Sequence, residues 1–134
     1  MKEKKDRVDD ALQATKAALE EGIVPGGGAV LLHARNCIET NNIGAQIVYN
    51  ACAAPFKKIL SNAGYEHEDI YNAINSVTGG NYWCGWDLKS EEFVNMKEAG
   101  IIDPAKVTRI ALENAASVAG TILLTEAVVV DKPE

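Results

Sequence analysis

Carboxylates at two places in this sequence are the strongest candidates for chemistry. Asp9 and Asp10 are adjacent in a charged stretch near the N-terminus, and Asp103 stands directly before Pro104. A carboxylate can orient a water, act as a general base or hold Mg²⁺. Neighbouring positions on a helix do not share a face, so only one of Asp9 and Asp10 would point at a given site. A solvated helix face is the simpler explanation of this pair from the residues alone.

Asp103 has two possible roles, which can coexist. An aspartate followed by proline is typical of a helix start, because the carboxylate accepts hydrogen bonds from unpaired N–H groups and proline suits the first helical position. A carboxylate at the end of a loop can also bind a ribose hydroxyl. The capping role is sufficient to explain the pattern, and the second role requires that one oxygen remain free.

Two further features could contribute to a ligand site. The glycine run 26–28 leads into a predicted helix, and glycine lets a phosphate or a base approach the backbone closely. The run matches neither the dinucleotide-binding spacing nor the P-loop spacing, and a tight turn between helices explains it equally well. The aromatic residues Tyr82, Trp83 and Trp86 could stack on a base, although core filling or an interface anchor is more common.

The apolar periodicity predicts a mainly α protein. We expect helices at residues 2–21, 29–38, 43–54 with a continuation over 56–62 after Pro55, 68–77, 95–99 and 105–124. The helical period is lost over residues 82–93, which predicts a short β-hairpin or an irregular loop. Residues 127–130 are a β-type run and predict a C-terminal β-strand, which would pair with residues 82–93, with another chain or with a missing part of the protein.

Composition excludes several functional classes. The formal net charge is -6, which argues against a nucleic-acid partner. No apolar run approaches the roughly 20 residues that span a bilayer, so no membrane association is expected. The charged N-terminus is not a secretory signal. The three cysteines (Cys37, Cys52 and Cys84) therefore read as free thiols, and no spacing of histidines and cysteines predicts a metal site.

Several stretches, in order, resemble the group I chaperonins, the 60-kDa family of ATP-driven folding cages. They are KEKKDRVDDAL at 2–12, EEGIVPGGG at 20–28, AP at 54–55, GG at 79–80, GWD at 85–87, FVNM at 93–96, GIIDPAKVTR at 100–109, AASVAG at 115–120 and TEAVV at 125–129. Each motif is weak alone, but together they cover essentially the whole chain.

The resemblance implies a fold and a domain assignment. Residues 1–22 would be a helix of the intermediate domain, and residues 23–134 the C-terminal half of the equatorial ATP-binding domain. That half is helical, with a small β-hairpin and a C-terminal strand. Subunits of the family usually form two stacked rings of seven. Their ATPase drives the encapsulation of unfolded clients under a co-chaperonin lid.

The resemblance also implies site residues for ATP or ADP with Mg²⁺. Asp10 matches the aspartate that positions the attacking water, and Gly27 the glycine against the base and ribose. Asp103 matches the aspartate that binds the ribose hydroxyls, and Ile101 lines the same pocket. The adenine-edge segment corresponds to Asp87, Leu88 and Lys89. Many relatives have asparagine in place of Asp87, followed by small residues, so the adenine contact differs here.

The sequence lacks two parts of that family's subunit. The phosphate-binding loop, with its Gly-Asp-Gly-Thr-Thr pattern and main Mg²⁺ ligand, is absent, and so is the apical domain that binds clients and the lid. We therefore expect a fragment without significant ATPase activity that self-associates through apolar faces. Lys57 and Glu66 match positions of contact between the two rings. The expected location is the cytoplasm of a bacterium or phage-infected cell, or else the mitochondrial matrix or plastid stroma. The alternative is a non-catalytic helical interaction module.

Overall fold

The computed structural model describes residues 2–130 and is mainly helical, as predicted. The helices are α1 (Lys2–Glu21), α2 (Ala29–Ala34) with a 3-10 turn at Arg35–Cys37, α3 (Ile43–Ala51), α4 (Ala54–Asn62), α5 (His67–Gly79) and α6 (Ala105–Leu123). Asn42 caps α3, because its side-chain oxygen accepts a hydrogen bond from the Ala45 amide at 2.9 Å. Pro55 lies in the first turn of α4, where its missing N–H costs nothing.

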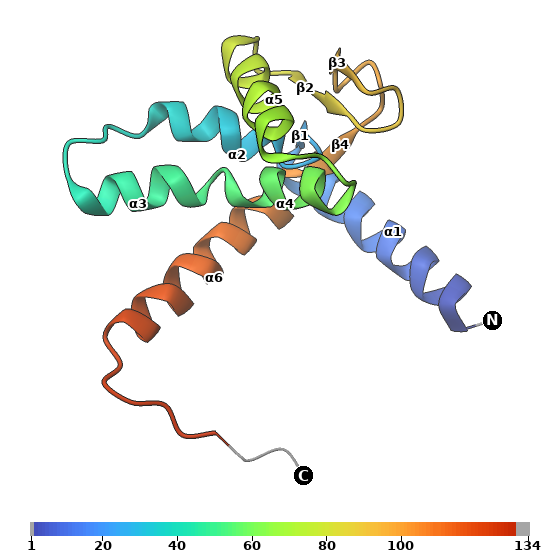
Figure 1. The fold of residues 1–134 in the computed structure, drawn as a ribbon. Coiled ribbons are helices and arrows are strands. Elements are labelled where there is room, and N and C mark those ends of the chain that lie inside the picture. Colours follow the sequence, from blue (N-terminus) through green and yellow to red (C-terminus); the bar gives the residue numbers. More distant parts are fainter. Residues whose placement is uncertain (1, 131–134) are drawn as a thin grey trace.

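Four short strands form two separate antiparallel pairs. The first pair joins β1 (Ile23–Pro25) to β4 (Ile102–Pro104), with Val24 opposite Asp103. The second joins β2 (Cys84–Asp87) to β3 (Glu92–Asn95) and is the hairpin that the sequence predicts. Figure 1 shows that β1 and β4 lie where the helical elements converge.

The hydrophobic core lies between α2, α4 and α5, with the β2–β3 hairpin against α5. Phe56 and Leu60 of α4 are about 1 % exposed, and Val77 of α5 is fully buried. The other members of the cluster are Ala29, Leu32, Ala53, Ile70, Ala73 and Ile74, with Tyr65, Trp86 and Leu88 packed against it. The spacing of Ile70, Ala73, Ile74 and Val77 is one face of a helix, so the periodicity correctly predicts what α5 buries.

The glycine turn lets α2 pack tightly against α4. Gly28 has a φ of 78°, in the left-handed region where a side chain is strained. A Cβ atom on Gly28 would lie 2.9 Å from the backbone nitrogen of Phe56, a distance that real Cβ atoms do not show. Packing alone therefore requires glycine at this position.

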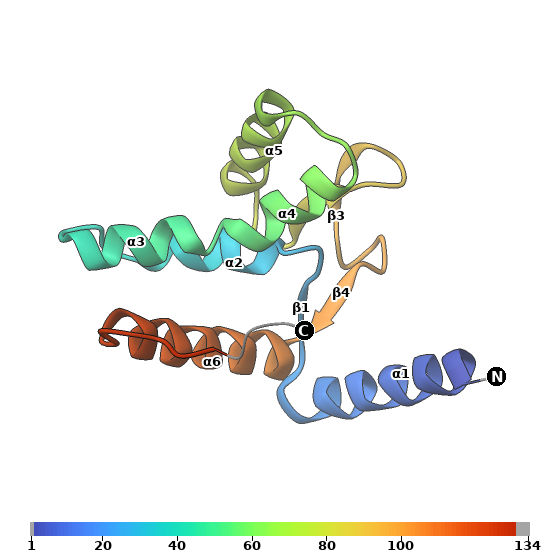
Figure 2. The ribbon, with the colours of Figure 1, turned by 60° about the horizontal axis from the view of Figure 1, so that its bottom comes forward.

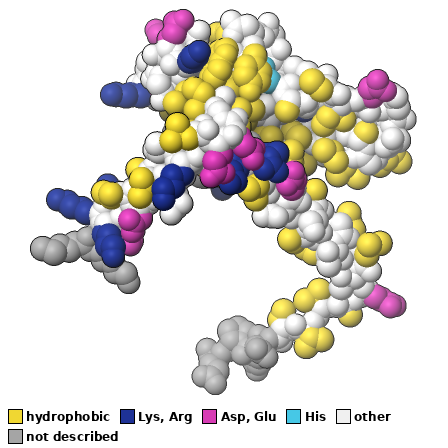
Figure 3. All heavy atoms as spheres, turned by 180° about the vertical axis from the view of Figure 1, so that it is seen from behind, with side chains coloured by type: hydrophobic (Ala, Val, Ile, Leu, Met, Phe, Trp, Pro, Cys, Tyr) yellow, Lys and Arg dark blue, Asp and Glu magenta, His cyan; other side chains and the backbone are white. Residues whose placement is uncertain are grey.

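Three helices lie outside this core. Neither α3 nor α6 has a buried residue, and α1 contributes none to the core. Figures 1 and 2 show α1 and α6 extending away from the strands in different directions. Exposed apolar side chains follow α3 and α6, among them Ile43, Ile47, Val118, Ile122 and Leu123, and Figure 3 shows apolar atoms spread along α6. No helix within residues 2–130 is long and apolar enough to cross a membrane.

One predicted helix is wrong, and the predicted C-terminal strand does not form within the described chain. Residues 127–130 pair with no strand of residues 2–130, and Val128, Val129 and Val130 are largely exposed; their pairing with another chain or a missing part stays a prediction. Residues 96–100 are a turn rather than a helix, closed by a hydrogen bond from the Ile101 amide to the Met96 carbonyl at 2.9 Å. That turn redirects the chain from the hairpin into β4.

Candidate functional site

The β1–β4 pair brings together two stretches that are far apart in the sequence. The Gly26 amide donates a hydrogen bond to the Ile101 carbonyl at 3.0 Å, directly beyond the paired strands. A Cβ atom on Gly26 would lie 3.1 Å from the Ile101 backbone, so the two chains touch. The glycine turn therefore lies beside the segment that holds Ile101 and Asp103. Of the predicted site residues, Gly27, Ile101 and Asp103 come together here.

Gly27 is the glycine of this turn that packing requires least. It has a φ of 62°, but a Cβ atom there would meet only the Met96 side chain, at an ordinary contact distance of 3.4 Å. Gly26 and Gly28 are held by backbone contacts on either side, whereas Gly27 meets only a flexible side chain. Its backbone face is therefore the part of the turn that a ligand could approach.

Asp103 does not cap α6, and that prediction is wrong. Its backbone is in β4, Pro104 takes the cap position, and no side-chain cap bond forms. The Ala105 amide, which a cap would have satisfied, instead donates to the Gly22 carbonyl at 3.1 Å. The Asp103 carboxylate is half-buried and makes no hydrogen bond to the described residues, and this burial raises its pKa. A desolvated carboxylate without a partner favours binding a hydroxyl donor.

Asp10 lies apart from this group. It lines an open cleft of about 610 Å³ between α1 and α6, which also includes Pro104. At a rise of about 1.5 Å per residue, Asp10 is roughly 16 Å along α1 from Glu21, the last residue of the helix. The structure thus places Asp10 on the same cleft as the start of α6, but not beside the Gly27 turn.

Ion pairs join the end of α1 to the start of α6. Arg109 donates from Nη2 to Oε1 of Glu21 at 2.6 Å and from Nε to Oε2 at 3.0 Å, and Lys106 pairs with Glu20. Arg109 also bonds Glu113. The hydrogen bond from Arg109 lowers the pKa of Glu21. Both cations already face carboxylates, so neither is free to hold a phosphate.

The carboxylate of Asp87 stabilises the turn of the β2–β3 hairpin. Its Oδ1 accepts from the Lys89 amide at 2.9 Å and its Oδ2 from the Ser90 hydroxyl at 3.0 Å, and these bonds, the Lys89 amide first, lower its pKa. Leu88 packs against the core, and Lys89 is exposed. No contact links these three residues to Gly27 or Asp103 within residues 2–130.

The aromatic residues of the hairpin region pack on the protein itself. The ring of Trp86 meets that of Tyr65 edge-on at 6.3 Å, and its Nε1 donates to the Tyr65 hydroxyl at 3.3 Å. Tyr82 meets Trp83 edge-on at 5.5 Å and also contacts His33. Trp86 therefore packs against the core, as the core-filling interpretation predicts, whereas Tyr82 is exposed.

A nucleotide fits the described residues only in part. The free Asp103 carboxylate and the open face of Gly27 suit a ribose and a base. The described residues offer no comparable set of groups for the phosphate chain. Lys106 and Arg109 are already paired with carboxylates, and α2, with only 6 residues, is too short to hold an anion at its N-terminus. Among the described residues, no group of three or more His, Cys, Asp or Glu side chains could hold a metal ion.

Sequence reasoning missed Arg35. It is the one charged side chain buried within residues 3–130, only 9 % exposed, and its guanidinium lies 4.7 Å from the ring centre of Tyr49. A signal was present, because Arg35 follows the apolar Leu32 by three positions and so shares its helical face.

Comparison with known proteins places the chain in a family. A sequence model of the TCP-1/cpn60 chaperonin family matches residues 1–133. Among solved structures, the chain is similar to the crystal structure of a group III chaperonin in the open state, with a TM-score of 0.74 and 31 % sequence identity. The alignment covers 84 % of this chain and 25 % of that one, so the chain spans about a quarter of that chaperonin's length. This chain belongs to the TCP-1/cpn60 chaperonin family.

Proposed function

We propose that the chain supplies the base and ribose half of the ATP site in a chaperonin of group I. In this assignment residues 1–22 belong to the intermediate domain and residues 23–134 to the C-terminal half of the equatorial domain. The complete subunit would assemble into a double heptameric ring and use ATP hydrolysis to encapsulate unfolded clients under a co-chaperonin lid. Family membership and the order of the sequence motifs support this assignment.

The half-buried, unpartnered carboxylate of Asp103 beside the open glycine turn carries the proposal. Folding leaves this carboxylate desolvated without a compensating donor, and that arrangement costs stability unless a ligand supplies the donor. Ribose hydroxyls are such donors. Ile101 precedes it by two residues on the same segment and accepts a hydrogen bond from Gly26, the neighbour of Gly27 in the turn. Gly27 and Ile101 would contact the base and sugar.

Asp10, on the cleft between α1 and α6, would orient the attacking water. A carboxylate can orient a water for attack on a phosphorus atom. Since Asp10 is distant from the Gly27 turn, this role requires α1 to swing about its end at Gly22, which has a φ of 84° and no atom within 4 Å of a Cβ position. Mg²⁺, when bound with ATP, would neutralise the phosphate charge, and its main ligand would come from outside this chain.

The chain alone would then be inactive as an ATPase. Phosphoryl transfer depends on preorganised donors and a metal around the phosphates. In this proposal the described residues would provide the ribose end of the site and a water-orienting carboxylate, without free cations for the phosphates.

A second function is a helical interaction module without catalysis. The observation that favours it is the apolar surface of α3 and α6, where Ile43 is 77 % exposed and Leu123 83 % exposed. Such faces are typical of segments that pack against another part of an assembly. This role requires no nucleotide.

Calorimetric titration with ATP and ADP in the presence of Mg²⁺ tests the first proposal. We expect weak binding to the unmodified chain, loss of binding in Asp103→Ala, and unchanged binding in Asp6→Ala, which removes an exposed carboxylate elsewhere. Binding that persists in Asp103→Ala would overturn the assignment of Asp103. No binding to any of the three proteins would favour the interaction module.

A further inference from the structure

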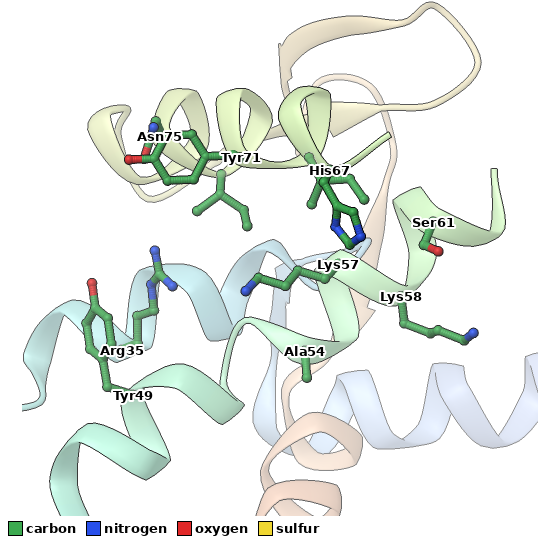
Figure 4. A pocket seen from close by; sticks show the side chains of 11 residues that line it. Arg35, Tyr49, Ala54, Lys57, Lys58, Ser61, His67, Tyr71 and Asn75 are labelled. Carbon is green, nitrogen blue, oxygen red and sulfur yellow. The ribbon is translucent and has the colours of Figure 1, made fainter. Parts of the chain in front are cut away.

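A second cavity, of about 880 Å³, lies between the helices on the far side of the core from α6. It is open to solvent and is bordered by the end of α2, by α3, by α4 and by α5, and Figure 4 shows it from close by. The polar residues that line it are Arg35, Tyr49, Lys57, Lys58, Ser61, His67, Tyr71 and Asn75. No acidic residue of the described chain lines it, although the protein carries a net charge of -6.

Arg35 is the unusual member of this set. Its side chain is more than nine-tenths buried, and its Nε atom has no hydrogen-bond partner. No carboxylate of the described residues forms an ion pair with it, and its guanidinium lies over the Tyr49 ring. A buried N–H group without an acceptor is costly, and a native protein normally pairs it.

Lys57 brings a second positive charge to the same space. Figure 4 shows its side chain extending from α4 toward Arg35, with Tyr71 and Asn75 above them on α5. The structure gives Lys57 no ion pair among the described residues. Two cations that converge without an acid repel one another, and an anion between them would remove that repulsion.

We propose that this cavity binds a small molecule that carries a phosphate monoester. A guanidinium fork together with an ammonium group suits the several oxygens of a phosphate. The Tyr71 hydroxyl and the Asn75 amide would donate to the remaining polar groups of the molecule. Cavities that bind small molecules typically enclose about 300–1,000 Å³, so this one has room for an organic body beyond the phosphate.

This site is separate from the proposed nucleotide pocket. None of Gly27, Ile101 and Asp103 lines the cavity. Arg35 follows the C-terminal end of α2, whereas the glycine turn precedes its N-terminal end. The test therefore uses glucose 6-phosphate, which has no adenine base, and its failure would leave the Asp103 assignment untouched.

Calorimetric titration of the full chain with glucose 6-phosphate, inorganic phosphate and glucose tests the proposal. We expect both phosphates to bind and glucose not to bind. Arg35→Met keeps an apolar side chain of similar length and should weaken binding at least roughly tenfold, the effect of losing a charged hydrogen bond. Lys57→Ala, at an exposed position, tests the same contact without disturbing the core. Lys58→Ala is the matched control, because Lys58 also lines the cavity but its side chain points away from Arg35 in Figure 4.

The outcomes separate the alternatives. Loss of binding in Arg35→Met and Lys57→Ala, with Lys58→Ala unchanged and all variants showing the unfolding transition of the parent, would establish the site. Absence of phosphate binding, or equal affinity in Arg35→Met, would overturn it. An acidic peptide that binds more tightly than glucose 6-phosphate and depends on Arg35 would also overturn it, and would assign the cavity to a carboxylate of a partner subunit.

Discussion

Helices α5 and α6 are both amphipathic, yet only one of them is packed. Four residues of α5 are buried in the core (Ile70, Ala73, Ile74 and Val77), whereas the 19 residues of α6 bury none. The same contrast separates α4 from α3, its neighbour in the chain. Apolar periodicity therefore predicts which face of a helix can be buried, but it does not predict whether the same chain buries that face. In this chaperonin-family chain, one region has a closed core and the other presents unpartnered faces.

The largest effect expected from this comparison is at Phe56. Phe56→Ala removes a fully buried ring from the α4–α5 core and should lower the free energy of unfolding by about 3–5 kcal/mol. Ile122→Ala on α6, where the side chain is 62 % exposed, should change it by about 0.5 kcal/mol or less. Urea unfolding followed by circular dichroism measures both. Similar losses at the two positions would show that α6 is packed in solution and would remove the contrast.

The exposed face of α6 should also govern self-association. Sedimentation velocity at rising concentration should show association of the unmodified chain, since contiguous apolar surface seeks burial. The double variant Val118→Gln with Ile122→Gln should shift the protein toward monomer, and the control Ser117→Gln should not. A chain that stays monomeric at high concentration would contradict the expectation.

The smallest effect concerns the ion pairs between α1 and α6. Arg109 lowers the pKa of Glu21 from its usual value of 4.5, so the stabilisation is present above that pH and is lost as pH falls through the lowered pKa. The melting temperature of Glu21→Gln should lie slightly below that of the parent at neutral pH, and the difference should vanish in acid. Glu92→Gln, which removes an exposed carboxylate on β3, is the control. A difference in melting temperature that grows on acidification would contradict this prediction.

Local patterns predicted much of this fold. The bounds of α1, the start of α6 after Pro104, the β2–β3 hairpin and the buried face of α5 all follow from periodicity and breaker residues. Each of these features depends on neighbours in the sequence. Because helix ends and turns are decided locally, the residues carry enough information to predict them.

Long-range pairing decided the features that the sequence did not predict. The strands β1 and β4 have three residues each and no alternation to mark them, and they form only because residues 23–25 and 102–104 meet. That meeting also removes the need for Asp103 as a cap, since the Gly22 carbonyl takes the Ala105 amide. The run at 127–130 has strong β propensity but no edge to join.

The residues of the candidate site were also predicted only in part. The resemblance to chaperonins pointed to Gly27, Ile101 and Asp103, and the structure brings these three together through β1 and β4. Asp10 and the hairpin residue Asp87 lie apart from them. The ligand roles of all five residues stay predictions. The buried Arg35 was missed, because its isolation from any acid becomes visible only when the surrounding helices are assembled.

Hydrogen exchange followed by mass spectrometry tests the two-region account most directly. Isolated helices of this length are marginal in water, so amides of α3 and α6 should exchange far faster than those of α4 and α5 in dilute solution. The account predicts slow exchange confined to the core between α2, α4 and α5 and to the adjoining hairpin. Protection of α6 equal to that of α5 in a monomeric sample would contradict it, because it would mean that the chain buries the apolar face of α6 by itself.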